Sequence, residues 1–170
     1  ISFLTLAATA QTSVPLESGS AVKFIITNLG FDVGGSLKGL TGTINFDEKN
    51  LTASLFTVSV NSNTINTENG SRDKHLRGAD YFDVAKYPLI KIASVKIARS
   101  VTPGYYVMFA KLTIKDKTQD ISFPFTAVAE STGYRFKGKF KIKRRDFGVG
   151  SKNTVSNELT VNLDVLSKKN

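Results

Sequence analysis

Apolar and polar residues alternate along most of this chain, as they do in strands that bury one face. The regularity is greatest in residues 136–143, where Phe136, Phe140 and Ile142 share one face and lysines occupy the other. Strand side chains point alternately to the two faces of a sheet, so a period of two predicts β-structure. We predict about eight strands. They cover residues 22–27, 43–47, 51–60, 89–98, 106–114, 121–129, 136–143 and 155–165.

Local departures from the alternation predict irregular points in the sheet. The glycines within residues 34–42 lie between the first two predicted strands, and we interpret them as turns or bends. The apolar face changes between Ile92 and Val95, which indicates a bulge or a strand buried on both faces. Pro124 occupies the outer face of its strand, which indicates an edge or a bulge because proline cannot donate to a ladder.

One segment, residues 71–88 (SRDKHLRGADYFDVAKYP), does not alternate at all. It crowds five ionisable residues into the six positions 72–77 and contains the only histidine of the chain. We predict a short helix in the 70–80 crossover, beginning after Asn69 and Gly70 with Ser71 as its N-cap.

We predict a single domain over residues 11–170, because no linker or low-complexity block divides the chain. An antiparallel sheet of this length buries its apolar face by forming a sandwich or by closing into a barrel. Residues 1–10 are apolar and end in Ala8-Thr9-Ala10, which resembles the cleavage region of a secretory signal peptide. We interpret them as the remnant of such a signal or, alternatively, as an apolar N-terminal tail.

Composition narrows the chemistry. The 170 residues include no cysteine and one histidine, which excludes a disulfide framework, a thiolate nucleophile and a zinc site with several histidines. The acidic residues show no spacing typical of a metal-binding loop. We therefore predict no metal and no cofactor.

The net charge of +9 is concentrated most clearly in Lys137, Lys139, Lys141 and Lys143, with arginines nearby. This basic strand suits an anionic membrane surface or a protein partner, or else it is simply a solvated face that blocks edge aggregation. We predict no nucleic-acid binding, because the outward face that carries the lysines has no aromatic side chains among them, unlike the surfaces of single-strand binders.

Several ordered motifs are similar to those of one family. Arg72-Asp-x-His-Leu-Arg77, Tyr81-Phe-Asp83 and Tyr87-Pro-x-Ile90 resemble the central signature of the YceI-like family, and Arg145-Asp-Phe-Gly148 resembles its late turn. The resemblance covers roughly residues 20–166. It implies an all-β fold, a single antiparallel eight-stranded lipocalin-like barrel, exported to the periplasm or secreted. It also implies an apolar cavity that binds isoprenoid or other long-chain lipids.

On this basis we expect an exported protein, not an enzyme, that sequesters or carries an amphiphilic lipid of polyprenyl, quinone or fatty-acyl type. The apolar lining that we expect comprises Phe24, Ile26, Ile44, Phe46, Phe56, Val58, Ile90, Ile92, Met108, Leu112, Phe123, Phe125 and Phe140. The residues that we expect at the mouth, beside the lipid head, are Arg72, Asp73, His75, Arg77 and Tyr81.

Three alternatives stay open at this point. His75 suits a general base in an enzyme acting on a small apolar substrate, although we favour a structural ring that donates to a carbonyl or to Asp73. The arginines around Asp73 suit a headgroup site or a local Arg–Asp network. The basic strand Lys137–Lys143 suits a surface adaptor, and a homodimer is compatible with the sequence.

Overall fold

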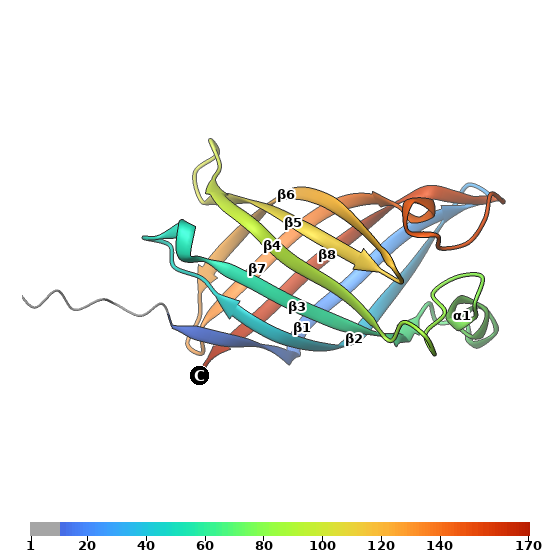
Figure 1. The fold of residues 1–170 in the computed structure, drawn as a ribbon, viewed down its shortest axis with the longest axis horizontal. Coiled ribbons are helices and arrows are strands. Elements are labelled where there is room, and N and C mark those ends of the chain that lie inside the picture. Colours follow the sequence, from blue (N-terminus) through green and yellow to red (C-terminus); the bar gives the residue numbers. More distant parts are fainter. Residues whose placement is uncertain (1–10) are drawn as a thin grey trace, which may run out of the picture.

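In a computed structural model, which describes residues 11–170, the chain forms a closed antiparallel barrel of eight strands in sequential order (Figure 1). This confirms the predicted all-β barrel. The expectation for residues 1–10 lies outside the described residues. The strands are β1 (Thr12–Asn28), β2 (Phe31–Asn45), β3 (Leu55–Asn66), β4 (Leu89–Arg99), β5 (Tyr105–Ile114), β6 (Lys117–Ala129), β7 (Tyr134–Lys143) and β8 (Val155–Lys169). The helices are α1 (Gly70–Arg77) and two 3-10 turns, η1 (Leu51–Ala53) and η2 (Arg144–Phe147).

The barrel has two different ends (Figure 1). At one, which we call the helix end, lie the β1–β2 turn, the crossover with α1, the β5–β6 turn and the β7–β8 connection with η2. At the other, which we call the terminal end, lie η1, the β4–β5 and β6–β7 loops and the C-terminus. Because the strands form a simple meander, every strand runs from one end to the other.

We interpreted the glycines within residues 34–42 as turns or bends; they are not turns but irregular points within the continuous strand β2. Gly39 and Gly42 have positive φ, and the β2–β3 register shifts between Ser36 and Thr41. A Cβ on Gly42 would run into the carbonyl of Thr57, and one on Gly35 would overlap the ring of Phe24. Glycine therefore permits close approach and bulging within a strand here, rather than a reversal of the chain.

The predicted bulge in β4 is confirmed, since the register to β5 shifts between Ser94 and Lys96. Pro124 lies neither on an edge strand nor at a register shift, so that prediction was wrong. It pairs with Val107 of β5, and the β6–β7 ladder begins only at Phe125, directly after it. The missing N–H thus falls where one neighbouring ladder has not yet begun.

The predicted helix in the 70–80 crossover is confirmed as α1, but its N-cap is Asn69 and not Ser71. The Asn69 side chain accepts a hydrogen bond from the backbone N–H of Arg72 at 3.0 Å. Ser62 of β3 holds the far end of the crossover, because its hydroxyl donates to the carbonyl of Tyr87 at 2.7 Å. The crossover is therefore fixed against β3 at both ends.

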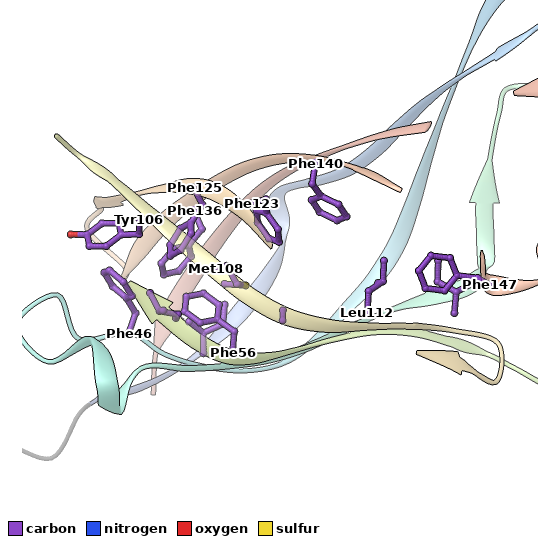
Figure 2. Close-up of a cluster of buried hydrophobic side chains, with 14 of the residues drawn as sticks. Phe46, Phe56, Tyr106, Met108, Leu112, Phe123, Phe125, Phe136, Phe140 and Phe147 are labelled. Carbon is purple, nitrogen blue, oxygen red and sulfur yellow. The ribbon is translucent and has the colours of Figure 1, made fainter. Parts of the chain in front are cut away.

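Aromatic side chains fill the barrel toward the terminal end (Figure 2). The Phe46 ring lies 5.3 Å from Tyr106, 5.1 Å from Tyr134 and 5.5 Å from Phe136, all in edge-to-face contact. Each such pair contributes about 0.5–1.5 kcal/mol beyond its burial. We call this filled part the aromatic half; its members are Ile44, Phe46, Phe56, Ile97, Tyr106, Met108, Phe123, Phe125, Tyr134 and Phe136.

Candidate functional site

Toward the helix end, the barrel interior is hollow. A cavity of about 350 Å³ occupies it, which lies within the usual range of small-molecule sites, roughly 300–1,000 Å³. Its walls are mainly aliphatic, and we call this part the hollow half. Its apolar strand residues are Val22, Phe24, Ile26, Val33, Leu37, Leu40, Val58, Val60, Ile65, Ile90, Ile92, Leu112, Ile114, Phe140, Ile142, Val155, Leu159, Val161, Leu163 and Val165.

The boundary between the two halves is a stacked aromatic pair. Phe140 lines the cavity, while Phe123 belongs to the aromatic half, and their ring centroids lie 4.6 Å apart (Figure 2). Beyond this pair most of the interior strand positions are valine, isoleucine and leucine, and Phe24 is the other aromatic strand residue that lines the cavity. An eight-stranded barrel has an interior that large side chains fill and smaller ones leave open for one ligand.

The structure divides the apolar residues that we expected to line the cavity into two groups. Phe24, Ile26, Val58, Ile90, Ile92, Leu112 and Phe140 line it. Ile44, Phe46, Phe56, Met108, Phe123 and Phe125 do not; they lie in the aromatic half. Their inward direction is as expected, but they belong to the strand ends farther from the cavity, where they pack against one another.

The residues expected at the mouth also divide. Arg72, His75 and Tyr81 line the cavity, whereas Asp73 and Arg77 do not. Arg77 donates from Nε to the carbonyl of Asn63 and from Nη2 to that of Ile65. These bonds fasten α1 to the end of β3, so the position of Arg77 is explained by anchoring.

Asp73 and Arg72 meet at Thr67 rather than at each other. The Asp73 carboxylate is buried and accepts from the Thr67 N–H at 2.8 Å and from the Thr67 hydroxyl at 2.6 Å. Arg72 donates from Nε to the same hydroxyl and from Nη2 to the Thr67 carbonyl, both at 2.7 Å. Within residues 11–170 no Arg72–Asp73 ion pair forms, so the expected Arg–Asp network is in fact relayed by a threonine. This arrangement leaves Arg72 Nη1 available at the cavity.

The His75 ring packs against Tyr81, with ring centroids 4.9 Å apart and ring planes tilted by 60°. The bond that we expected from its ring to a carbonyl or to Asp73 is not present in the described part of the chain. Ser71 and Asp80 share a shallower outer hollow with His75, yet no hydrogen bond among residues 11–170 joins the ring to either. A nucleophile and its base normally lie within hydrogen-bond reach, so this geometry does not form a catalytic triad.

Sequence reasoning missed Arg144 as a site residue. Its side chain is buried and lines the cavity beside Tyr81. Its guanidinium donates to the carbonyls of Val149, Ser151, Val155 and Ser156 and to the Asn153 side chain, over 2.8–3.0 Å. Burial lowers the pKa of Arg144 from its ordinary value. A single cation therefore organises the whole β7–β8 connection at the mouth.

The signal for Arg144 was present in the alternation itself. Lys137, Lys139, Lys141 and Lys143 point outward, so the next residue falls on the inward parity. The contribution of β8 to the cavity was missed in a similar way. The strand was predicted, but its inward residues, including Leu159 and Val161, were not assigned to the site.

The basic strand is partly neutralised. On its outer face Lys137 lies 3.4 Å from Asp164 and Lys141 lies 2.7 Å from Glu158, both acids from β8.

Within residues 11–170, no cluster of three or more His, Cys, Asp or Glu side chains is arranged to hold a metal ion. Over the same residues, no helix has the length and apolar character needed to cross a membrane.

Comparison with known proteins places this geometry in a family. The YceI-like domain model matches residues 15–166. A UPF0312 protein of Yersinia pestis is 31% identical over 135 residues, which cover 75% of this chain and 69% of that protein.

Solved structures share the fold. BcnA of Burkholderia cenocepacia superimposes with a TM-score of 0.83 at 22% identity, covering 89% of this chain and 98% of BcnA. A polyisoprenoid binding domain from Saccharophagus degradans, implicated in plant cell wall breakdown, superimposes with a TM-score of 0.73 at 16% identity, covering 95% and 100%. The match over nearly the whole barrel, together with the crossover and late-turn motifs that first suggested it, shows that this chain belongs to the YceI-like family.

Proposed function

We propose that this protein binds one long-chain amphiphilic lipid, with the tail in the hollow half and the head at the helix end. The observation that carries the proposal is the aliphatic cavity of about 350 Å³, most of whose polar lining residues, all but Lys23 and Ser59, lie at the helix end. The binding of a polyisoprenoid by a structural relative supports the same ligand class, as does family membership.

Apolar burial supplies the affinity in this proposal. Burying apolar surface contributes about 25 cal/mol per Å², so a tail that buries roughly 200 Å² gains about 5 kcal/mol before the cost of ordering it. Aliphatic walls offer no directional contacts, so they accept polyprenyl, quinone-linked or fatty-acyl tails alike. The tail therefore sets affinity and the rim sets selectivity.

At the rim, cationic and aromatic groups surround the position of the head. Arg72 is held by Thr67 through Nε and Nη2, which aims its remaining N–H groups without further ordering cost. Tyr81 is fixed by the Asn153 amide, which donates to its hydroxyl at 3.1 Å. A head that accepts hydrogen bonds, such as a quinone carbonyl, a carboxylate or a phosphate, suits these groups.

The proposal is for binding and carriage rather than turnover, because His75 contacts an aromatic ring and, among residues 11–170, forms no hydrogen bond to a nucleophile. It also includes export to the periplasm or the medium, where a lipid would need shielding from water.

The first test is native mass spectrometry of the purified protein, followed by organic extraction and identification of any bound molecule. We expect a discrete added mass that extracts as one prenyl or acyl amphiphile. Val58→Phe places a ring inside the cavity and should abolish that mass, whereas Thr57→Phe, on the outward face of the same strand, should keep it.

A clean apo mass that persists after incubation with mixed membrane lipids would overturn the proposal. His75→Ala separates binding from catalysis: it should retain the lipid. Chemical conversion of the extracted lipid by the wild type, but not by His75→Ala, would establish an enzyme instead.

A further inference from the structure

The β1–β2 turn presents two large apolar side chains to solvent. Asn28 and Phe31 close a two-residue turn in which Leu29 has φ 51° and Gly30 has φ 82°. Turns of this kind favour asparagine, aspartate or glycine, because in a left-handed conformation the Cβ of other residues lies too close to the following carbonyl oxygen. Leu29 is nevertheless 69% exposed and Phe31 is 77% exposed. Neither strain nor exposure is offset by packing within the described chain.

This turn is part of the cavity mouth. Asn28 lines the cavity, and its side chain accepts a hydrogen bond from the Thr154 hydroxyl at 3.0 Å. Asn28 also pairs with Val155 at the start of β8. The turn therefore projects from the helix end beside the β7–β8 connection (Figure 1).

The neighbouring connection is basic. Residues 143–154 expose Lys143, Arg145 and Lys152 against one acidic residue, Asp146, while Arg144 is buried. Lys115 of the β5–β6 turn joins the same surface, because its Nζ donates to the carbonyl of Gly148 at 3.0 Å. Apolar tips flanked by basic residues match the interface of a bilayer that carries anionic lipids, which attracts basic side chains near its surface.

We propose that the helix end docks on an anionic lipid bilayer, with Leu29 and Phe31 inserted among the headgroups and the cavity mouth facing the membrane. The proposal deepens the proposed function, because it describes how cargo reaches the cavity. Contact between two copies through this surface is disfavoured, since it would bring the basic connection of one copy against that of the other. Docking mouth first lets an apolar tail pass between bilayer and cavity without crossing water.

The absence of tryptophan from the chain permits a sharp test. Phe31→Trp places one fluorophore at the proposed insertion point. Val101→Trp places a matched one in the β4–β5 loop at the terminal end, where Val101 is fully exposed. On vesicles of phosphatidylcholine with one quarter phosphatidylglycerol, we expect the emission of the first variant to shift to the blue and that of the second to stay unchanged.

Partitioning to these vesicles, measured by co-sedimentation, should fall about tenfold for Phe31→Ser, in line with the loss of one buried aromatic side chain. Val101→Ser should leave it unchanged. Vesicles of phosphatidylcholine alone, or high salt, should also weaken binding of the wild type. No shift for Phe31→Trp, or equal shifts for both tryptophan variants, would overturn the proposal. So would a shift that appears without vesicles and grows with protein concentration, because this would indicate self-association.

The two proposals fail in different ways. If lipid is taken up from ethanol or detergent solution but Phe31→Trp does not respond to vesicles, docking is wrong and lipid binding stands. If Phe31→Trp inserts but the cavity takes up no lipid by either route, the proposed function is wrong and docking stands.

Discussion

The aromatic half and the hollow half share strands β2, β3, β4, β5 and β7, yet their interiors differ in kind. On β5, Tyr106 and Met108 pack in the first, whereas Leu112 and Ile114 border the cavity in the second. On β7, Phe136 packs in the aromatic half, whereas Ile142 borders the cavity. Aromatic rings meet across the barrel and close it, while aliphatic side chains do not. The position of a residue along its strand therefore decides whether it stabilises the fold or shapes a binding space.

The largest expected difference comes from the same truncation made in each half. Ile44→Ala removes a side chain that is 1% exposed in the aromatic half, and it should cost about 3–4 kcal/mol in the free energy of unfolding without affecting lipid uptake. Ile92→Ala removes atoms that border an existing cavity, so it should cost only about 1 kcal/mol and should weaken lipid binding. Urea unfolding with and without lipid measures both effects.

Equal destabilisation by the two changes would mean that the hollow half is packed as tightly as the aromatic half. The division between them would then be wrong.

A smaller effect should follow from a change at the rim. Arg144→Lys keeps the charge but cannot serve acceptors on Val149, Ser151 and Ser156 together, so it should cost about 2 kcal/mol. Hydrogen exchange should rise in residues 144–155 and stay unchanged in the aromatic half. The exposed neighbour provides the control, since Arg145→Lys should change neither measurement. Uniform acceleration of exchange across the barrel would contradict the view that Arg144 acts on the rim alone.

The smallest effect is expected at the ion pair between Lys141 of β7 and Glu158 of β8, on the outer face of the barrel. The hydrogen bond from Lys141 lowers the pKa of Glu158 below its ordinary value of 4.5. Because the folded-state pKa is depressed, the stabilisation is present above pH 4.5 and is lost as the pH falls through the folded-state value. Lys141→Gln should therefore lose slightly less stability than the wild type when the pH falls through this range.

Lys139, whose register partner is Asn162, provides the matched control, and Lys139→Gln should leave the acid dependence unchanged. Thermal unfolding between pH 3 and 6 at low salt measures both. Identical curves for the wild type and Lys141→Gln would show that the pair contributes nothing.

Much of the fold could be predicted because alternation has a direct physical cause. Inward residues such as Phe136 and Phe140 must leave water, and outward ones such as Lys139 must stay in it, so the period of two is visible without coordinates. The crossover helix was visible for the opposite reason, since residues 71–88 break the period. The full extent of strand β2 could not be predicted, because glycine occurs both in turns and where another part of the chain approaches closely. The glycines of β2 permit close packing against Phe24 and Thr57, and the sequence alone does not distinguish this from a turn.

The cavity lining was harder to predict, because inward direction alone does not separate core from cavity. Phe56 and Val58 both point inward on β3, yet only Val58 lines the cavity. The difference depends on which end of the barrel each residue lies nearer to, and this can be assigned only once the closed meander is known. With it, aromatic residues at one set of strand ends and aliphatic residues at the other could have been recognised.

The meander also brings the two ends of the described chain together. Ser13 pairs with Lys169, and the N–H of Asn170 donates to the carbonyl of Thr12 at 3.1 Å. Both lie at the terminal end, the full length of the barrel from the mouth (Figure 1). A circular permutant that joins them and opens the β4–β5 loop should keep every ladder intact. By the same geometry, protein immobilised on a sensor surface through its C-terminus would present its mouth to the solution.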